Sequence, residues 1–189
     1  MTHSFYWADH STADFASRDL SETVVILPIA AVEQHGPHLP VQVDAAINAA
    51  ILDRMVPLLD ANADVLILPA ISIGKSDEHL AYPGTLTISA QTLRLVWLDI
   101  AKSVERAGVR KMILFNSHGG QISLMEMTCT SAGMAASAAF CRRPSAAARA
   151  SVSVSSAPNQ STSAVRTCVR GAFDSRRCRN RSAAAFTVA

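Results

Sequence analysis

Three short apolar runs constrain the fold of this chain more than any other feature. They read TVVILPIA (residues 23–30), DVLILPAISI (residues 64–73) and KMILFNS (residues 111–117). Continuous apolar runs of this length are typical of strands that are buried on both faces of a parallel sheet. A polar loop follows each run, and a segment with helical periodicity follows each loop. The chain is therefore expected to contain an α/β domain.

The segments between the runs predict the helices of this domain. Residues 44–61 carry apolar side chains at helical spacing, and Asp44 is placed to cap that helix. A second helix is expected after Ser89, as its N-cap, with its end at Gly108. The segment GGQISLMEM begins a third helix. Strands and helices in alternation predict a mainly parallel sheet with right-handed crossovers.

The composition changes abruptly near residue 127. Residues 127–189 hold nine arginines, no lysine, one acidic residue, all four cysteines, and no leucine or isoleucine. Such a segment cannot supply apolar faces, so we expect it to be disordered or loosely helical and the C-terminal part of the fold to be incomplete. The predicted organisation is an N-terminal segment (1–20), an α/β domain (21–126) and an Ala/Ser/Arg-rich low-complexity tail (127–189). The composition of the tail is typical of a GC-rich gene that is read out of frame. This predicts a truncated or frameshifted product.

Other classes of protein are disfavoured. An Arg-rich tail could bind nucleic acid, but these arginines are scattered among alanines and serines without interleaved aromatics. The cysteines lack the close pairing of a zinc knuckle, and a disulfide framework does not fit a chain without a secretion signal. The apolar runs are too short to span a bilayer, and the N-terminus does not resemble a signal peptide. We therefore expect a cytoplasmic protein without a membrane partner.

Polar residues gather directly after two of the apolar runs, in the segments EQHGPHLPVQVD and FNSHGGQ. Glu33 and His35 are two residues apart, so in an extended segment their side chains point the same way. The carboxyl ends of parallel strands lie at one edge of a sheet, so we expect His118 to meet Glu33 and Asp44 there. Carboxylates and imidazoles are ligands for divalent cations. The alternative is that these are ordinary polar residues of surface loops.

Three segments together resemble the signatures of the creatininase family, the creatinine amidohydrolases and their relatives. They are LPIAAVEQHGPHLPVQVD, EHLAYPGTLTIS and FNSHGGQ, and they occur in this order across roughly residues 20–126. The resemblance implies a layered α/β/α fold, assembly as a homohexamer and a pair of divalent metal ions. Zinc is the first expectation, with manganese or iron as alternatives. It also implies an amidohydrolase that uses metal-activated water to cleave a C–N bond in a small cyclic or linear amide, such as creatinine.

The resemblance also carries roles to particular positions. It implies four metal ligands, which are Glu33, His35, Asp44 and His118, with Asp44 as the bridging carboxylate. Glu78 and His79 precede the YPGT turn and are the candidate catalytic residues; the alternative is an exposed polar pair. His38 either orients a ligand or packs beneath its loop. Ser76 and Asn116 could donate hydrogen bonds to the ligands.

The likeness to the family ends near Met127. Family members continue with a strand and a segment of His-Ala-Gly-Glu type that supplies an acidic ligand, and some place a glutamate where this chain has Gly120. Loss of one carboxylate would weaken binding or activity about 10- to 100-fold or more. An inactive truncated product is therefore the first alternative to an enzyme, and an Arg-rich nucleic-acid-binding protein the second. The site residues do not separate creatinine, a formamidopyrimidine-type formamide and a modified peptide as substrates.

Overall fold

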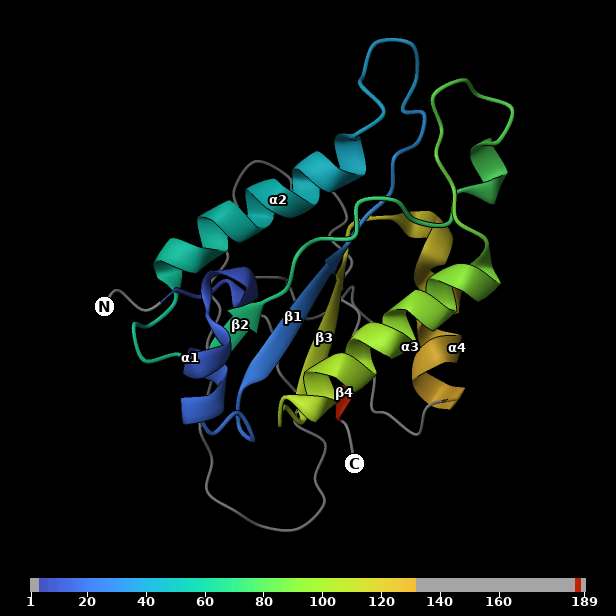
Figure 1. Ribbon diagram of the computed structural model, residues 1–189. Coiled ribbons are helices and arrows are strands. Elements are labelled where there is room, and N and C mark those ends of the chain that lie inside the picture. The colour runs from blue at the N-terminus through green and yellow to red at the C-terminus, as the bar shows by residue number, and fades with distance from the viewer. Residues whose placement is uncertain (1–3, 132–185, 188–189) are drawn as a thin grey trace, which may run out of the picture.

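A sheet with the strand order β2-β1-β3-β4 lies at the centre of the fold (Figure 1). The computed structural model describes residues 4–131 and 186–187 of the chain. The strands are β1 (Val24–Ile29), β2 (Val65–Ile67), β3 (Lys111–Asn116) and β4 (Phe186–Thr187). The first three are parallel, and β4 pairs antiparallel with β3. The predicted parallel sheet is thus confirmed, with each apolar run contributing one strand.

The strand β2 is shorter than the apolar run that predicted it. Its ladder continues as far as the hydrogen bond from the Leu68 amide to the Ile26 carbonyl, at 2.9 Å. Pro69 follows and has no N–H to donate, so regular pairing stops there. Ile71 then returns to the sheet, because its amide bonds the Pro28 carbonyl at 2.9 Å. The segment after β2 therefore stays beside β1 although it is not a regular strand.

Within the described residues, three α-helices follow the strands as expected and a fourth precedes β1. They are α1 (Thr12–Ser17), α2 (Val43–Met55), α3 (Ala90–Arg106) and α4 (Ile122–Ser131). Short 3-10 turns flank them, namely η1 (Trp7–Asp9), η2 (Val56–Leu58), η3 (Asp77–His79) and η4 (Gly119–Gln121). The Ser89 hydroxyl accepts from the Thr92 amide at 3.3 Å, which confirms the predicted N-cap of α3. Gly108 has a φ of 100°, the left-handed conformation expected just after a helix.

Two predictions about α2 were wrong. Gln42, not Asp44, is the N-cap residue, and it makes no side-chain capping bond. Asp44 lies inside the first turn, where its carboxylate is buried and turned toward the loops that follow the strands. The helix also ends at Met55 rather than near residue 61, because Pro57 cannot donate the next helical hydrogen bond.

The helices cover both faces of the sheet (Figure 1). On one face, α3 and α4 pack against the side chains of Val25, Leu27 and Ile29. Trp97 and Met112 lie in this core with 2% and 1% of their surface exposed. On the other face, α2 lies over Pro28 and Ala30. This arrangement is the predicted α/β/α layering, which follows because the right-handed crossover from β1 to β2 and the one from β2 to β3 run in opposite directions along the sheet.

The N-terminal segment is described from Ser4 onward and contains η1 and α1. The Ser11 hydroxyl and the Asp14 carboxylate form a reciprocal capping box at the start of α1. The Ile67 amide donates to the Phe5 carbonyl at 2.7 Å, so residues near Tyr6 extend the free edge of β2. The segment therefore covers an edge strand.

The predicted boundary at residue 127 falls inside α4, which continues to Ser131. Apart from the end of α4 and the two residues of β4, the predicted low-complexity tail lies outside the described residues, as do three of its cysteines. Within the part of the chain that the structure describes, no helix combines the length and the apolar character needed to cross a membrane.

Candidate metal centre

The polar segments that follow β1 and β3 meet at the carboxyl end of the sheet. His35 contributes Nε2 at 3.3 Å from Asp44 Oδ1. His118 places Nδ1 at 2.9 Å from Asp44 Oδ2 and at 3.2 Å from Glu33 Oε1. The structure thus places all four predicted metal ligands next to one another, although they come from three separate segments.

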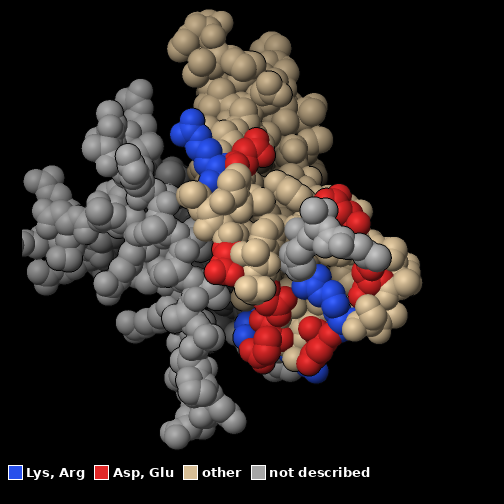
Figure 2. Space-filling model, turned by 90° about the vertical axis from the view of Figure 1, so that its left-hand side faces the viewer, with Lys and Arg blue, Asp and Glu red and all other residues tan. Residues whose placement is uncertain are grey.

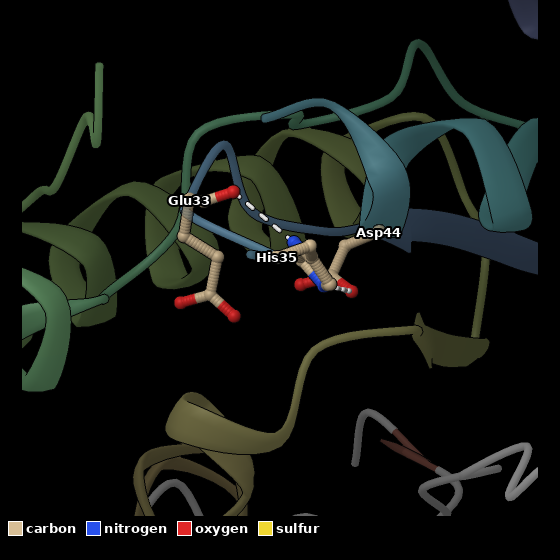
Figure 3. A group of neighbouring side chains, drawn as sticks. All are labelled: Glu33, His35 and Asp44. Carbon is tan, nitrogen blue, oxygen red and sulfur yellow. Dashed lines mark hydrogen bonds and ion pairs between the residues drawn. The ribbon is translucent and has the colours of Figure 1, made fainter. Parts of the chain in front are cut away.

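The Asp44 carboxylate lies between the two imidazoles, with one oxygen toward each. Figure 3 shows the His35 ring between this carboxylate and the backbone carbonyl of Glu33. That carbonyl accepts from His35 Nδ1 at 3.1 Å, so Nδ1 carries a proton and Nε2 is the nitrogen that faces the Asp44 carboxylate. A histidine with this arrangement has its second nitrogen ready to bind a cation.

Burial makes this cluster costly without a cation. Glu33 and Asp44 are each 6% exposed and His118 is 2% exposed. Two buried carboxylates destabilise the fold unless positive charge or hydrogen bonds compensate them. Two sets of donors have ligand atoms within 4.8 Å of one another, namely Glu33 with His35 and Asp44, and Glu33 with Glu78 and His118. Carboxylate and imidazole donors at this spacing fit one or two divalent ions.

The protonation of His118 follows from its neighbours. Its Nε2 lies 2.8 Å from the Lys75 carbonyl, which can only accept, so Nε2 carries a proton. Burial alone would lower the pKa of His118, but its hydrogen bonds to Asp44 and the Lys75 carbonyl and the charge of Glu33 together raise it. The pocket around Nδ1 therefore favours a positive charge, which either a second proton or a metal ion can supply.

Neighbouring side chains hold His118 in place. Asn116 Nδ2 donates to the His118 carbonyl at 2.7 Å, and the His118 amide donates back to Asn116 Oδ1 at 3.0 Å. Ser76 Oγ lies 3.3 Å from Nε2. Both residues thus contact His118, as proposed from the sequence. Gln121 and Lys75 were missed, although Gln121 Nε2 donates to Asn116 Oδ1 at 2.9 Å.

A second group of hydrogen bonds fixes α2 against the strand ends. Asn48 is 2% exposed, and its Nδ2 donates to the carbonyls of Ile29 at 3.1 Å and Phe115 at 3.0 Å. The Ser117 hydroxyl donates to the Asp44 carbonyl at 2.8 Å. Asn48 therefore sets the position from which Asp44 reaches the centre. The only sequence signal for it was a lone asparagine within an alanine-rich helical segment.

Glu78 and His79 lie on η3 and border the buried ligands. His79 Nδ1 donates to Glu33 Oε2 at 2.7 Å, since a carboxylate can only accept. Glu78 Oε2 pairs with Lys75 Nζ at 3.1 Å, and Oε1 lies 3.9 Å from His118 Nε2. Partial burial would raise the pKa of Glu78, but a backbone hydrogen bond, Lys75 and the charge of His118 lower it. Glu78 is therefore held as a carboxylate.

His38 differs from its neighbours in the same loop. It is exposed and belongs to neither of the donor groups found among the described residues. A separate cavity of about 190 Å³ lies between α2 and the sheet, lined in part by Asn48 and Leu52. The four predicted ligands do not line this cavity. The candidate functional site is therefore the cluster at the carboxyl ends of the strands.

Comparison with known proteins gives a consistent result. The creatininase family model, described as creatinine amidohydrolase, matches residues 8–176. The chain is 34% identical over 113 residues to the mycofactocin precursor peptide peptidase of Mycolicibacterium smegmatis, covering 58% of this chain and 45% of that protein. It is 29% identical over 124 residues to the creatinine amidohydrolase of Pseudomonas putida, covering 62% and 46%. The chain thus spans about half the length of these relatives.

Solved structures share the fold. A mutant creatininase complexed with creatine aligns with a TM-score of 0.60 and 25% identity, covering 68% of this chain and 51% of that one. Creatininases of a Zn–Zn type and with Mn also share the fold, with TM-scores of 0.58 and 0.52.

Proposed function

The chain belongs to the creatininase family, and from this premise we propose that it is a metal-dependent hydrolase of amide C–N bonds. One observation carries the proposal. Glu33, Asp44 and His118 are buried together at the carboxyl end of a parallel sheet, and within the described residues the two carboxylates form ion pairs with histidines and with no lysine or arginine. A bound cation is the simplest source of the missing positive charge.

The ligands of this cation are proposed to be Glu33, His35, Asp44 and His118. We propose a pair of divalent ions, with Zn²⁺ first and Mn²⁺ or Fe²⁺ as alternatives, supported by the Zn and Mn forms of structurally similar creatininases. Such ions, when bound, polarise an amide carbonyl and lower the pKa of water. Asp44 has one oxygen toward each histidine and is therefore suited to lie between two ions.

We propose that His79 accepts and donates protons beside the metal centre. Its Nδ1–H is engaged by Glu33, which leaves Nε2 as the nitrogen that can accept or return a proton. The side chain is 27% exposed, so a substrate can reach it. An amide nitrogen must gain a proton to leave, and an imidazole is a common general acid for such a transfer. Glu33 thus serves the metal with one oxygen and orients His79 with the other.

The rim of the centre favours an uncharged substrate segment. Residues 80–89 and 36–42 contain no charged side chain, and Leu39, Leu80, Tyr82 and Leu86 are exposed there. Figure 2 shows charges of both signs over the lower part of one side of the molecule and none on its uppermost part. Apolar rims contact apolar substrate groups. We therefore propose a peptide amide flanked by apolar residues, with creatinine as the second candidate because of the Pseudomonas putida relative.

Hydrolysis by the full-length chain tests this function. The metal-free protein is loaded with Zn²⁺ or Mn²⁺ and incubated with creatinine and with peptides of apolar sequence, and products are identified by mass spectrometry. We expect a peptide to be cleaved, EDTA to stop cleavage and added metal to restore it. Asp44→Asn should lose activity, whereas Asp53→Asn, an exposed carboxylate on the same helix, should keep it. Absence of any metal-dependent cleavage would contradict the proposal.

A further inference from the structure

The side-chain space beside Gly120 is filled by a carboxylate from a different loop. A Cβ built on Gly120 would overlap Glu78 Oε1 and would lie 2.6 Å from His118 Nε2. A Cβ built on Gly119 meets nothing within 4 Å. Neither glycine has a left-handed φ, so backbone conformation does not demand glycine at either position. At residue 120, a side chain would force Glu78 and His118 to shift, because both approach the backbone there.

The two carboxylate oxygens of Glu78 face different neighbours. Its Oε2 bonds Lys75 Nζ at 3.1 Å, and its Oε1 is turned toward His118 Nε2 at 3.9 Å. Ligand atoms of Glu33, Glu78 and His118 all lie within 4.8 Å of one another. Lys75 thus holds one oxygen of Glu78 on the solvent side, which leaves the other oxygen facing the buried donors.

From this geometry we propose that Glu78 is a metal ligand, which completes the second ion's donor set with Glu33 and with Nδ1 of His118, because Nε2 is engaged by the Lys75 carbonyl. The inference rests on the proposed metal centre and gives Glu78 a role at the metal instead of at the substrate. Gly120 is then the residue that makes room for this ligand, and Lys75 is a positioning residue. The first ion would be held by Glu33, His35 and Asp44, so Glu33 belongs to both donor sets, and Asp44 Oδ2, 2.9 Å from His118 Nδ1, lies beside the second.

Lys75 contributes to the second donor set in two ways. Its carbonyl accepts from His118 Nε2 at 2.8 Å, and its ammonium group holds Glu78. The ammonium group also lies 3.6 Å from Asp77 Oδ2, on the side chain that precedes Glu78. Asp77 is 46% exposed and is absent from both donor groups of the described chain, so it offers a matched carboxylate for comparison.

The test counts metal ions instead of measuring turnover. Full-length wild type, Glu78→Gln and Asp77→Asn are dialysed against buffered Zn²⁺ or Mn²⁺, and bound metal is measured by mass spectrometry. We expect wild type and Asp77→Asn to bind two ions per chain. Glu78→Gln should bind the first ion normally and the second roughly 10- to 100-fold more weakly. With Mn²⁺, electron paramagnetic resonance should show a spin-coupled pair in wild type and an isolated ion in Glu78→Gln.

The outcomes separate this inference from the proposed function. If Glu78→Gln binds both ions as tightly as wild type, the assignment of Glu78 is wrong while the metal centre stands. If wild type binds no ion at all, the proposed function fails and the assignment fails with it. Thermal melts of the three proteins show whether they are equally folded, and the glutamine keeps the size of the original side chain.

Discussion

Replacing Gly120 by alanine is a single-methyl perturbation whose effect can be worked from the structure. The added Cβ would overlap Glu78 Oε1 and crowd His118 Nε2 at 2.6 Å. Glu78 is the end of a flexible, partly exposed side chain, but His118 is buried and held by Asn116 and Lys75. The crowding must therefore move Glu78 outward, shift the imidazole, or do both.

The matched change at Gly119 isolates this effect. Both substitutions stabilise the fold by about 0.4–1 kcal/mol through the unfolded chain, because both backbones accept an alanine. Overpacking at residue 120 should cost about 1–3 kcal/mol. The two variants should thus differ by about 1–3 kcal/mol in the free energy of unfolding. At roughly 4 °C for each kcal/mol in a domain of this size, Tm should differ by about 4–12 °C.

Thermal melts followed by circular dichroism measure that difference on metal-free protein. Metal titrations of the same two variants should show weaker binding for Gly120→Ala than for Gly119→Ala, because Glu78 and His118 are displaced only in the first. Equal Tm values and equal metal affinities for the two variants would show that no side chain fills the space beside residue 120.

Three further predictions concern the fold that supports the centre, each measured by chemical denaturation. Asn48→Asp should destabilise the protein by about 3–5 kcal/mol, because a carboxylate oxygen then faces two buried strand carbonyls. Asn48→Ala should destabilise it less, and equal losses of stability for the two variants would contradict this reasoning. Trp97→Phe should stay within about 1 kcal/mol of wild type, because the buried indole N–H has no partner within the described chain; a loss above about 3 kcal/mol would contradict that. Hydrogen bonds from Ser11 lower the pKa of Asp14, so they stabilise the fold only while that carboxyl is ionised. Ser11→Ala should therefore be destabilising at neutral pH, and the difference should shrink as the pH falls through the lowered pKa.

The sequence predicted the sheet well because its signal is local. Each strand needs a short apolar run, and such a run is too short for a buried helix. The N-cap at Ser89 and the left-handed Gly108 were equally local features. Errors arose where one residue outweighed the pattern, as when Pro57 ended α2 early and Pro69 stopped β2.

The contacts around the ligands were harder to predict, since they join residues far apart in the chain. Lys75 and His118 are 43 residues apart, and Asn48 and Phe115 are 67 apart. Such pairs have no spacing rule, so Lys75, Gln121 and Asn48 gave little signal. The role of Asp44 was ambiguous for a different reason. An acidic residue near the start of a helix can be either an N-cap or a buried metal ligand. Only the burial of its carboxylate separates the two roles.

Calorimetric titration of Zn²⁺ or Mn²⁺ into the metal-free full-length protein tests the central claim most directly. Two histidines of one loop provide the comparison, since His35 contacts Asp44 and His38 is exposed outside both donor groups of the described residues. Wild type and His38→Ala should bind metal alike, and His35→Ala should bind at least about 10-fold more weakly. Wild type that binds no metal, or His35→Ala that binds as tightly as wild type, would contradict the metal centre.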